Sequence, residues 1–176
     1  MGVIEVTVYD TGDLDIIVNA LGDVVGLDQS LMRIGERTIT DALAMISDRV
    51  INQKKTAYNT PFHNYDSSNV YSPSHTKKRQ RAGLQTNRRD LNYTGDMWSS
   101  VRIKERKKTP DIKITGGVYG TDSHGESNET KLMTNTLWEE QKNAGAKVME
   151  LSDKELDFLT DAVVKNVEEM LIRRLK

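Results

Sequence analysis

The chain has 176 residues, of which 36% are hydrophobic and 29% charged, and its formal net charge is −1. This length supports one real hydrophobic core, so we expect a single domain over residues 1–176. No apolar run approaches the roughly 18 residues that cross a bilayer, and acids stand near the N-terminus, so we expect neither a membrane partner nor a signal peptide. The sequence contains no cysteine, which excludes disulfides and thiolate metal sites and suits the reducing cytosol in which we expect the chain to be made.

Charge is distributed unevenly along the chain. Residues 77–108 contain eleven Lys or Arg and three acids, an excess of +8, so the remainder must carry −9 to reach the net charge of −1. The basic part could hold an anion, or it could meet the acidic surface of another copy of the chain. Only contact between copies of the chain makes use of both the basic segment and the acidic remainder. The cations are Lys77, Lys78, Arg79, Arg81, Arg88, Arg89, Arg102, Lys104, Arg106, Lys107 and Lys108.

The N-terminal residues 1–27 predict a strand followed by a short helix. Apolar and polar residues alternate from Ile4 to Val8, which is the period of a half-buried strand. After a Thr-Gly-Asp break, apolar residues recur at helical spacing from Leu14 to Leu21. This spacing predicts a short helix that ends near Gly22.

A long amphipathic helix is expected over residues 28–52, with Asp28 as its N-cap. Its apolar residues fall on one stripe, and charged residues occupy the rest of the helix surface. The stripe consists of Leu31, Ile39, Ala42, Leu43, Ile46 and Val50.

Residues 53–76 predict an extended loop arm, because they contain two prolines, many Asn and Ser, and aromatic residues that follow neither period. The aromatics suggest that the arm packs on something, and Tyr65 and Tyr71 are its candidate contacts. Near its end, Pro73 can open a short helix that Ser72 caps and Gly83 ends.

A second short helix is expected after Thr94, with Met97 and Val101 buried, and it leads into a β-hairpin over residues 101–119. Two runs with alternating apolar residues, joined by Thr-Pro-Asp, are the basis for the hairpin. Gly116 and Gly117 indicate a bulge or a close approach of another backbone or side chain.

The C-terminal part predicts a helix that Gly145 ends, a short strand over residues 146–151, and a long closing helix. Ser152 and Glu155 have the spacing of a capping box, which marks the start of the closing helix. Its expected apolar face consists of Leu156, Leu159, Val163, Val167, Met170 and Leu171.

These elements together predict an α+β fold. A small, mostly antiparallel sheet that includes the β-hairpin would pack on one side against two long amphipathic helices, with long loops between the elements. The strands and helices do not alternate regularly, which argues against a parallel sheet.

The sequence shows no set of residues with the types and spacing of a catalytic site. The three histidines, His63, His75 and His124, lie in polar stretches, and none has a second ligand at helical spacing. The segment Gly-Thr-Asp-Ser-His-Gly at residues 120–125 lacks the glycine two positions before the serine that a nucleophile elbow needs. A phosphate-binding glycine loop is also missing. We therefore expect no enzymatic activity, no metal and no cofactor.

The basic segment 77–108 is the main functional candidate. Clustered cations suit phosphate contacts, but only Tyr93 and Trp98 could stack on bases, and no helix-turn-helix or zinc-finger spacing is present. The same cations suit an acidic protein surface, so both alternatives stay open. For the turn from Thr94 to Trp98, the alternative to a contact role is that Gly95 permits the turn while Met97 fills the core. The candidate contact residues are Tyr65, Tyr71, Arg79, Arg81, Arg88, Arg89, Thr94, Gly95, Asp96, Trp98, Arg102, Lys104, Arg106, Lys107 and Lys108.

The order of short motifs resembles the tail-completion, or virion-morphogenesis, proteins of tailed bacteriophages over about residues 28–172. A Tyr-Ser element is followed by a Lys- and Arg-rich segment, a Leu-x-x-x-Gly-x-Met turn and a β-hairpin, and later by an aromatic helix, a glycine and a Leu-Ser pair. The family's usual Arg-Pro-Phe before the last strand is replaced by Ala146, Lys147 and Val148. The matching residues are Tyr71, Ser72, Lys77 to Gly83, Leu91, Thr94, Gly95, Asp96, Met97, Trp138, Gly145, Leu151 and Ser152.

This resemblance implies a structural subunit of the phage neck, made in the host cytoplasm and built into the virion. Such a subunit would assemble with copies of itself as a ring between portal or connector proteins and tail proteins. A nucleic-acid-binding module that uses residues 77–108, with non-specific DNA contact, is the alternative.

Overall fold

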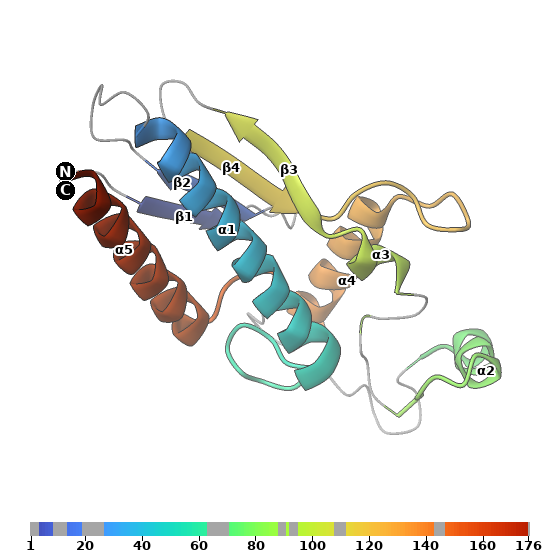
Figure 1. The fold of residues 1–176 in the computed structure, drawn as a ribbon. Coiled ribbons are helices and arrows are strands. Elements are labelled where there is room, and N and C mark those ends of the chain that lie inside the picture. The colour runs from blue at the N-terminus through green and yellow to red at the C-terminus, as the bar shows by residue number, and fades with distance from the viewer. Residues whose placement is uncertain are drawn as a thin grey trace.

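A computed structural model describes residues 4–8, 14–18, 27–62, 71–87, 91, 95–107, 112–142 and 147–175. Its fold is α+β, as predicted, with one antiparallel sheet and long helices on one side of it (Figure 1). The strands are β1 (Ile4–Val8), β2 (Leu14–Val18), β3 (Arg102–Lys107) and β4 (Ile112–Gly117). The helices are α1 (Leu27–Asp48), which continues as a π-helical turn (Arg49–Gln53), α2 (Pro73–Arg81), α3 (Asp96–Ser99), α4 (Asn128–Lys142) and α5 (Asp153–Leu175).

Within the described residues, the sheet has four strands in the order β1-β2-β4-β3, and each neighbouring pair is antiparallel. Its register aligns Val6 with Ile16 and Ile16 with Ile114, and it likewise aligns Thr7 with Asp15 and Asp15 with Thr115. Successive positions of a strand lie on opposite faces. One face of the sheet is therefore lined by apolar positions and the other by mostly polar ones. Ile114, on the apolar face, is fully buried in the core.

The predicted short helix over residues 14–22 is wrong in its described part, because Leu14–Val18 is strand β2, paired with both β1 and β4. The run Leu-Asp-Ile-Ile-Val satisfies a period of two as well as a helical spacing, and its β-branched residues favour a strand. Pairing on both edges supplies hydrogen bonds that an isolated short helix would not gain.

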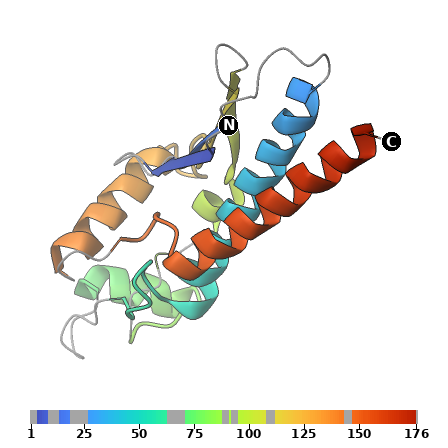
Figure 2. The ribbon, with the colours of Figure 1, turned by 90° about the vertical axis from the view of Figure 1, so that its left-hand side faces the viewer.

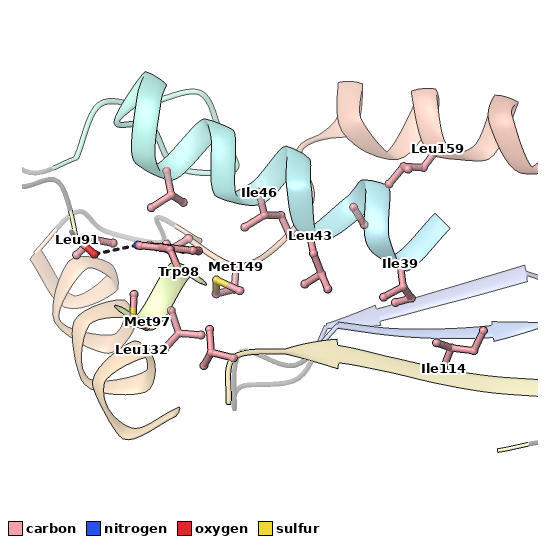
Figure 3. Close-up of a cluster of buried hydrophobic side chains, with 14 of the residues drawn as sticks. Ile39, Leu43, Ile46, Leu91, Met97, Trp98, Ile114, Leu132, Met149 and Leu159 are labelled. Atoms are coloured by element: carbon pink, nitrogen blue, oxygen red, sulfur yellow. Dashed lines mark hydrogen bonds between the residues drawn. The ribbon is translucent and has the colours of Figure 1, made fainter. Parts of the chain in front are cut away.

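Helix α1 supplies the centre of the core. All six residues of its predicted apolar stripe are buried, and the helix packs across β4, β2 and β3 (Figure 3). The helix begins at Leu27, so the prediction that Asp28 is its N-cap is wrong. After Asp48 the chain widens into the π-helical turn, which ends at Lys54 in a left-handed conformation with φ 57°.

Gly116 is a point of close approach between α1 and the sheet. A Cβ atom at this position would lie 2.6 Å from Cδ1 of Leu43 and 2.8 Å from Cγ2 of Ile39. The predicted close approach is confirmed, while the register shift of the hairpin lies on the partner strand, between Ile103 and Glu105. Glycine at position 116 therefore allows α1 to pack closely against β4.

Helix α5 packs against α1 rather than directly on the sheet (Figure 2). The predicted capping box at its start is confirmed, since the N–H of Ser152 donates to Oε2 of Glu155 at 2.7 Å and the N–H of Glu155 donates to Oγ of Ser152 at 3.3 Å. Leu159 and Val163 are buried, but Leu156 and Leu171 are each 40% exposed, which corrects the apolar face predicted for this helix.

The predicted strand over residues 146–151 is not formed in residues 147–151. This segment contributes Val148 and Met149 to the core, while its carbonyl groups accept from other segments: Lys147 from the N–H of Ala57 at 2.6 Å, and Val148 and Glu150 from Arg49. The backbone of this segment is hydrogen-bonded to the Arg49 side chain and to the loop at Ala57, and it does not pair with a strand.

Candidate interaction surfaces

The cations of the hairpin strand β3 are mostly engaged by acids and aromatics of the same chain. Nζ of Lys104 lies 2.7 Å from Oε1 of Glu129 at the start of α4, and Arg106 pairs with Glu36 on α1. These pairs hold the hairpin on two helices, although exposed pairs of this kind each contribute only about 1 kcal/mol or less. Their charge is largely neutralised within the chain.

Arg102, at the beginning of β3, stacks on an aromatic ring. Its guanidinium carbon lies 4.5 Å from the centroid of the Tyr119 ring, and the ammonium of Lys104 lies 5.7 Å from the same centroid. A cation over a ring face is attracted by the negative charge density of the ring. Tyr119 therefore gathers both cations at the base of the hairpin rather than at its tip.

Helix α2 forms as predicted from its ends. Oγ of Ser72 accepts from the N–H of His75 at 3.4 Å, Pro73 occupies the first turn, and Gly83 follows the helix with a positive φ of 69°. The helix lies apart from the sheet and from α5 (Figure 1). The structure therefore does not bring its cations beside those of the hairpin.

Tyr71 and Arg79, two of the predicted contact residues, are used to build α2. The Tyr71 ring stacks on the His75 ring with centroids 5.0 Å apart, and the guanidinium of Arg79 lies 4.6 Å from the Tyr71 centroid. Arg79 is only 1% exposed, and its Nε donates to the carbonyl oxygen of Gln85 at 2.8 Å. The charge of Arg79 therefore does not reach the surface of α2.

Three cations of α2 are exposed: Lys77, Lys78 and Arg81. Positions 77 and 81 lie four apart and positions 78 and 81 three apart, so the three side chains share one face of the helix. Within the part of the chain that the structure describes, none of the three forms an ion pair. We call these three residues the basic face of α2.

The turn at Gly95 to Trp98 belongs to the core. Gly95 has a φ of 84°, a left-handed conformation that glycine adopts without a Cβ penalty, and Met97 and Trp98 are 9% and 7% exposed. Nε1 of Trp98 donates to the carbonyl oxygen of Leu91 at 3.0 Å (Figure 3). This arrangement matches the second interpretation of the turn given in the sequence analysis, in which Gly95 permits the turn and Met97 fills the core.

The loop after the hairpin is organised by two aspartates. Asp96 accepts from Oγ of Ser123 at 3.2 Å, and Oδ1 of Asp122 accepts from the N–H groups of His124 and Glu126, each at 2.9 Å. Asp122 also pairs with Lys131, and this bond is the main cause that lowers the pKa of Asp122 to about 2. The loop is thus tied to both α3 and α4.

Helix α5 carries an exposed stripe of charged and apolar residues that the sequence patterns above do not single out. Asp157, Asp161, Val164, Glu168 and Leu171 follow a 4-3-4-3 spacing, which places them on one side of the helix, and all five are exposed. Lys154, three residues before Asp157, and Lys165, four residues after Asp161, are exposed on the same side. Within the described ranges, its three acids form no ion pair. The apolar pattern places Leu171 on the buried face and does not include Val164. The continuous spacing was the signal that could have identified the stripe, which we call the mixed stripe of α5.

Five of the predicted contact residues lie outside the described residues: Tyr65, Arg88, Arg89, Thr94 and Lys108. Only the backbone of Lys107 is described, as the last residue of β3.

Among the described residues, no group of three or more His, Asp or Glu side chains is placed to hold a metal ion. His124 is exposed, and the ring of His75 is stacked on Tyr71. A search of the same residues finds no helix with the length and apolar character needed to span a bilayer.

Comparison with known proteins finds no family model, no curated protein and no solved structure that matches this chain. The function therefore has to be argued from the surfaces described above.

Proposed function

We propose that this chain is a structural subunit of the head–tail neck of a tailed bacteriophage. Copies of the chain assemble as a ring between portal or connector proteins on one side and tail proteins on the other. The chain works through its surfaces and catalyses no reaction. The order of its short motifs, from Tyr71 to Ser152, supports the assignment to the neck.

The observation that carries the proposal is that two exposed helices on opposite sides of the molecule offer different surfaces. The basic face of α2 lies on one side of the molecule and α5, with its mixed stripe, on the other (Figure 1). A subunit that offers one surface and receives the complementary one forms head-to-tail contacts, and such contacts close into a ring when the rotation between neighbours allows it.

Apolar side chains on α5 add to this argument. Phe158 is 59% exposed, Ile172 54% and Val164 48%. Large apolar side chains that are exposed along one helix are typical of a surface that another protein covers.

The test is electron microscopy of purified virions from a host that expresses the chain with a small label. We expect a ring of labelled copies between portal and tail, and tailless particles when the chain is deleted. Particles that lack the chain, or that contain it only as a single isolated copy, would overturn the proposal.

A nucleic-acid-binding module is the second candidate, favoured by the exposed cations of α2. It requires affinity for duplex DNA that falls steeply with salt. The variant Lys77→Glu/Lys78→Glu should then show a shallower salt dependence, by about one unit of slope for each phosphate that the protein no longer neutralises. The neck assignment instead expects negligible DNA affinity for the wild-type chain and the variant alike.

A further inference from the structure

We propose that β3 of one copy adds to the outer edge of β1 of the next copy, so that the sheets of neighbouring subunits join into one antiparallel sheet. The inference rests on the proposed ring and specifies which two strands make its contact. The occupant of the β1 edge is therefore a defined strand of a second copy of this chain.

The two outer strands of the sheet provide the edges for this contact. Among the described strands, β1 pairs only with β2, and β3 pairs only with β4. The outer edge of such a strand presents backbone N–H and C=O groups that another strand can bond. The four strands alternate in direction, so β1 and β3 run in opposite directions. A neighbouring copy in the same orientation therefore brings its β3 antiparallel to β1.

Helix α5 extends the layer of helices towards the β1 edge. Both α1 and α5 lie on the same side of the sheet, and α5 lies beside α1 on the side of β1 (Figure 1, Figure 2). Four strands span about 19 Å, and two packed helices span about 16–20 Å. Adding one subunit after another at this edge therefore extends the sheet and the layer of helices by the same width.

One flank of α5 faces the layer in which an added strand would lie. Leu159 is buried and points towards α1 (Figure 3), and Val163 is buried one turn later. The helix is right-handed and runs antiparallel to α1 in front of the sheet (Figure 1). Positions about a quarter-turn further round the helix therefore face the sheet layer. These positions are Leu156, Thr160, Val164, Val167 and Leu171.

This flank is apolar but poorly covered in the single chain. Leu156 and Leu171 are each 40% exposed and Val164 is 48% exposed. Helix α1 packs across three strands of the sheet, whereas the main contact of α5 is with α1. A strand added beside β1 extends the sheet beneath α5 and covers these side chains, which is the usual fate of apolar residues on one side of a helix.

The residues of the two strands favour pairing of β1 with β3 over pairing of two identical edges. Strand β3 has the sequence Arg-Ile-Lys-Glu-Arg-Lys, so a second β3 beside it would bring like charges together. Strand β1 has only Glu5 as a charged residue. With Glu5 opposite Lys107, Thr7 lies opposite Glu105, and these positions belong to the same face of the sheet. Two β1 edges in contact would instead bring two α5 helices over the same edge.

Disulfide cross-linking tests the contact directly, because the chain has no cysteine of its own. Thr7→Cys on β1 combined with Glu105→Cys on β3 should give a ladder of linked oligomers, in solution or in assembled particles, because facing residues of paired strands lie within disulfide distance. Within one chain these positions are three strand spacings apart, about 14 Å, which is too far for a disulfide. Thr7→Cys combined with Thr130→Cys, at an exposed position of α4, is the matched control and should give no ladder.

Substitutions on α5 provide a second measurement. Val164→Asp combined with Leu171→Asp should weaken self-association about tenfold or more in sedimentation velocity over a concentration series, because the added strand would bury both carboxylates. Both residues are 40% or more exposed in the single chain, so the variant should stay folded, which circular dichroism checks. Phe158→Asp is the matched control. Phe158 is 59% exposed but lies on the flank of α5 that is turned away from the sheet, so association should change by about twofold or less.

The outcomes separate this inference from the proposed function. If virions contain the ring but the ladder between positions 7 and 105 is missing, the strand contact is wrong and the neck assignment stands. If Val6→Cys alone gives disulfide-linked dimers, two β1 edges meet each other and the strand contact is equally wrong. If the chain is missing from virions, the neck assignment falls, while a ladder in solution would still support the contact between β1 and β3.

Discussion

Arg49 and Glu155 form a buried ion pair, with Nε of Arg49 3.0 Å from Oε1 of Glu155, although 106 positions separate them in the sequence. Arg49 lies in the π-helical turn after α1 and is only 4% exposed, and Glu155 lies in the first turn of α5. The same guanidinium donates to the carbonyl oxygens of Lys55, Val148 and Glu150. One side chain therefore joins four segments of the chain.

Arg49→Ala should lower the free energy of unfolding by about 3–5 kcal/mol, because it leaves a poorly exposed carboxylate and several carbonyl groups without their donor. Urea unfolding followed by circular dichroism measures this loss. Arg37→Ala is the matched control, since its pair with Asp41 spans 3.9 Å between largely exposed side chains, and it should change stability by about 0.5 kcal/mol or less. Equal effects of the two substitutions would contradict the role assigned to Arg49.

Gly116→Ala should destabilise the protein by about 1–3 kcal/mol, because the added methyl group meets Ile39 and Leu43 at distances that no relaxed core accepts. The cost should shrink when Leu43→Ala opens space beside it, although Leu43→Ala alone costs about 2–5 kcal/mol. A double-mutant cycle measures the coupling between the two positions. Additive effects would show that α1 does not sit on Gly116 as described.

Asp122→Asn should reduce the sensitivity of the protein to acid. The pKa of Asp122 is lowered to about 2 in the folded chain, below the unperturbed value of about 3.9 for an unfolded one. The unfolded state thus binds a proton first as the pH falls, so the stability that Asp122 contributes is present above about pH 4 and is lost as the pH falls towards 2.

Urea unfolding at a series of pH values tests this prediction. Asp122→Asn should be less stable than the wild type at pH 7 and should lose less stability between pH 4 and pH 2. Asp41→Asn is the control, because the 3.9 Å pair of Asp41 with Arg37 lies between largely exposed side chains and should contribute little to stability. A wild-type profile for Asp122→Asn would contradict the bond to Lys131.

Trp98→Phe should lower stability without affecting self-association. Phenylalanine keeps most of the buried ring but cannot donate to the carbonyl oxygen of Leu91, which should cost about 1–2 kcal/mol. Unfolding and sedimentation of the same variant separate the two effects. Loss of association at full stability would instead identify Trp98 as an interface residue.

Much of the local structure followed from patterns within short windows of sequence. The apolar stripe from Leu31 to Val50 predicted a buried helix face, the Ser152 and Glu155 pair predicted the start of α5, and Ser72, Pro73 and Gly83 predicted both ends of α2. Each signal lies within a few turns of chain, and helix spacing and capping are local properties.

The candidate surfaces were predictable only in part. Counting charge identified the basic segment, but it could not show that Arg106 pairs with Glu36, that Lys104 pairs with Glu129, or that Arg79 is buried while Lys77 is exposed. Each of these outcomes depends on which residues the fold brings together from distant positions.

The sequence by itself therefore determined the elements whose period and caps are unambiguous, together with the unequal distribution of charge. The tertiary structure alone decided that Leu14–Val18 is a strand, since its pattern suits two periods and pairing with β1 and β4 selects one. It also decided which charges are neutralised within the chain and which remain exposed on α2 and α5. The physical reason is that strand pairing, burial and ion pairing join residues far apart in sequence, whereas helix periodicity and capping act between neighbours.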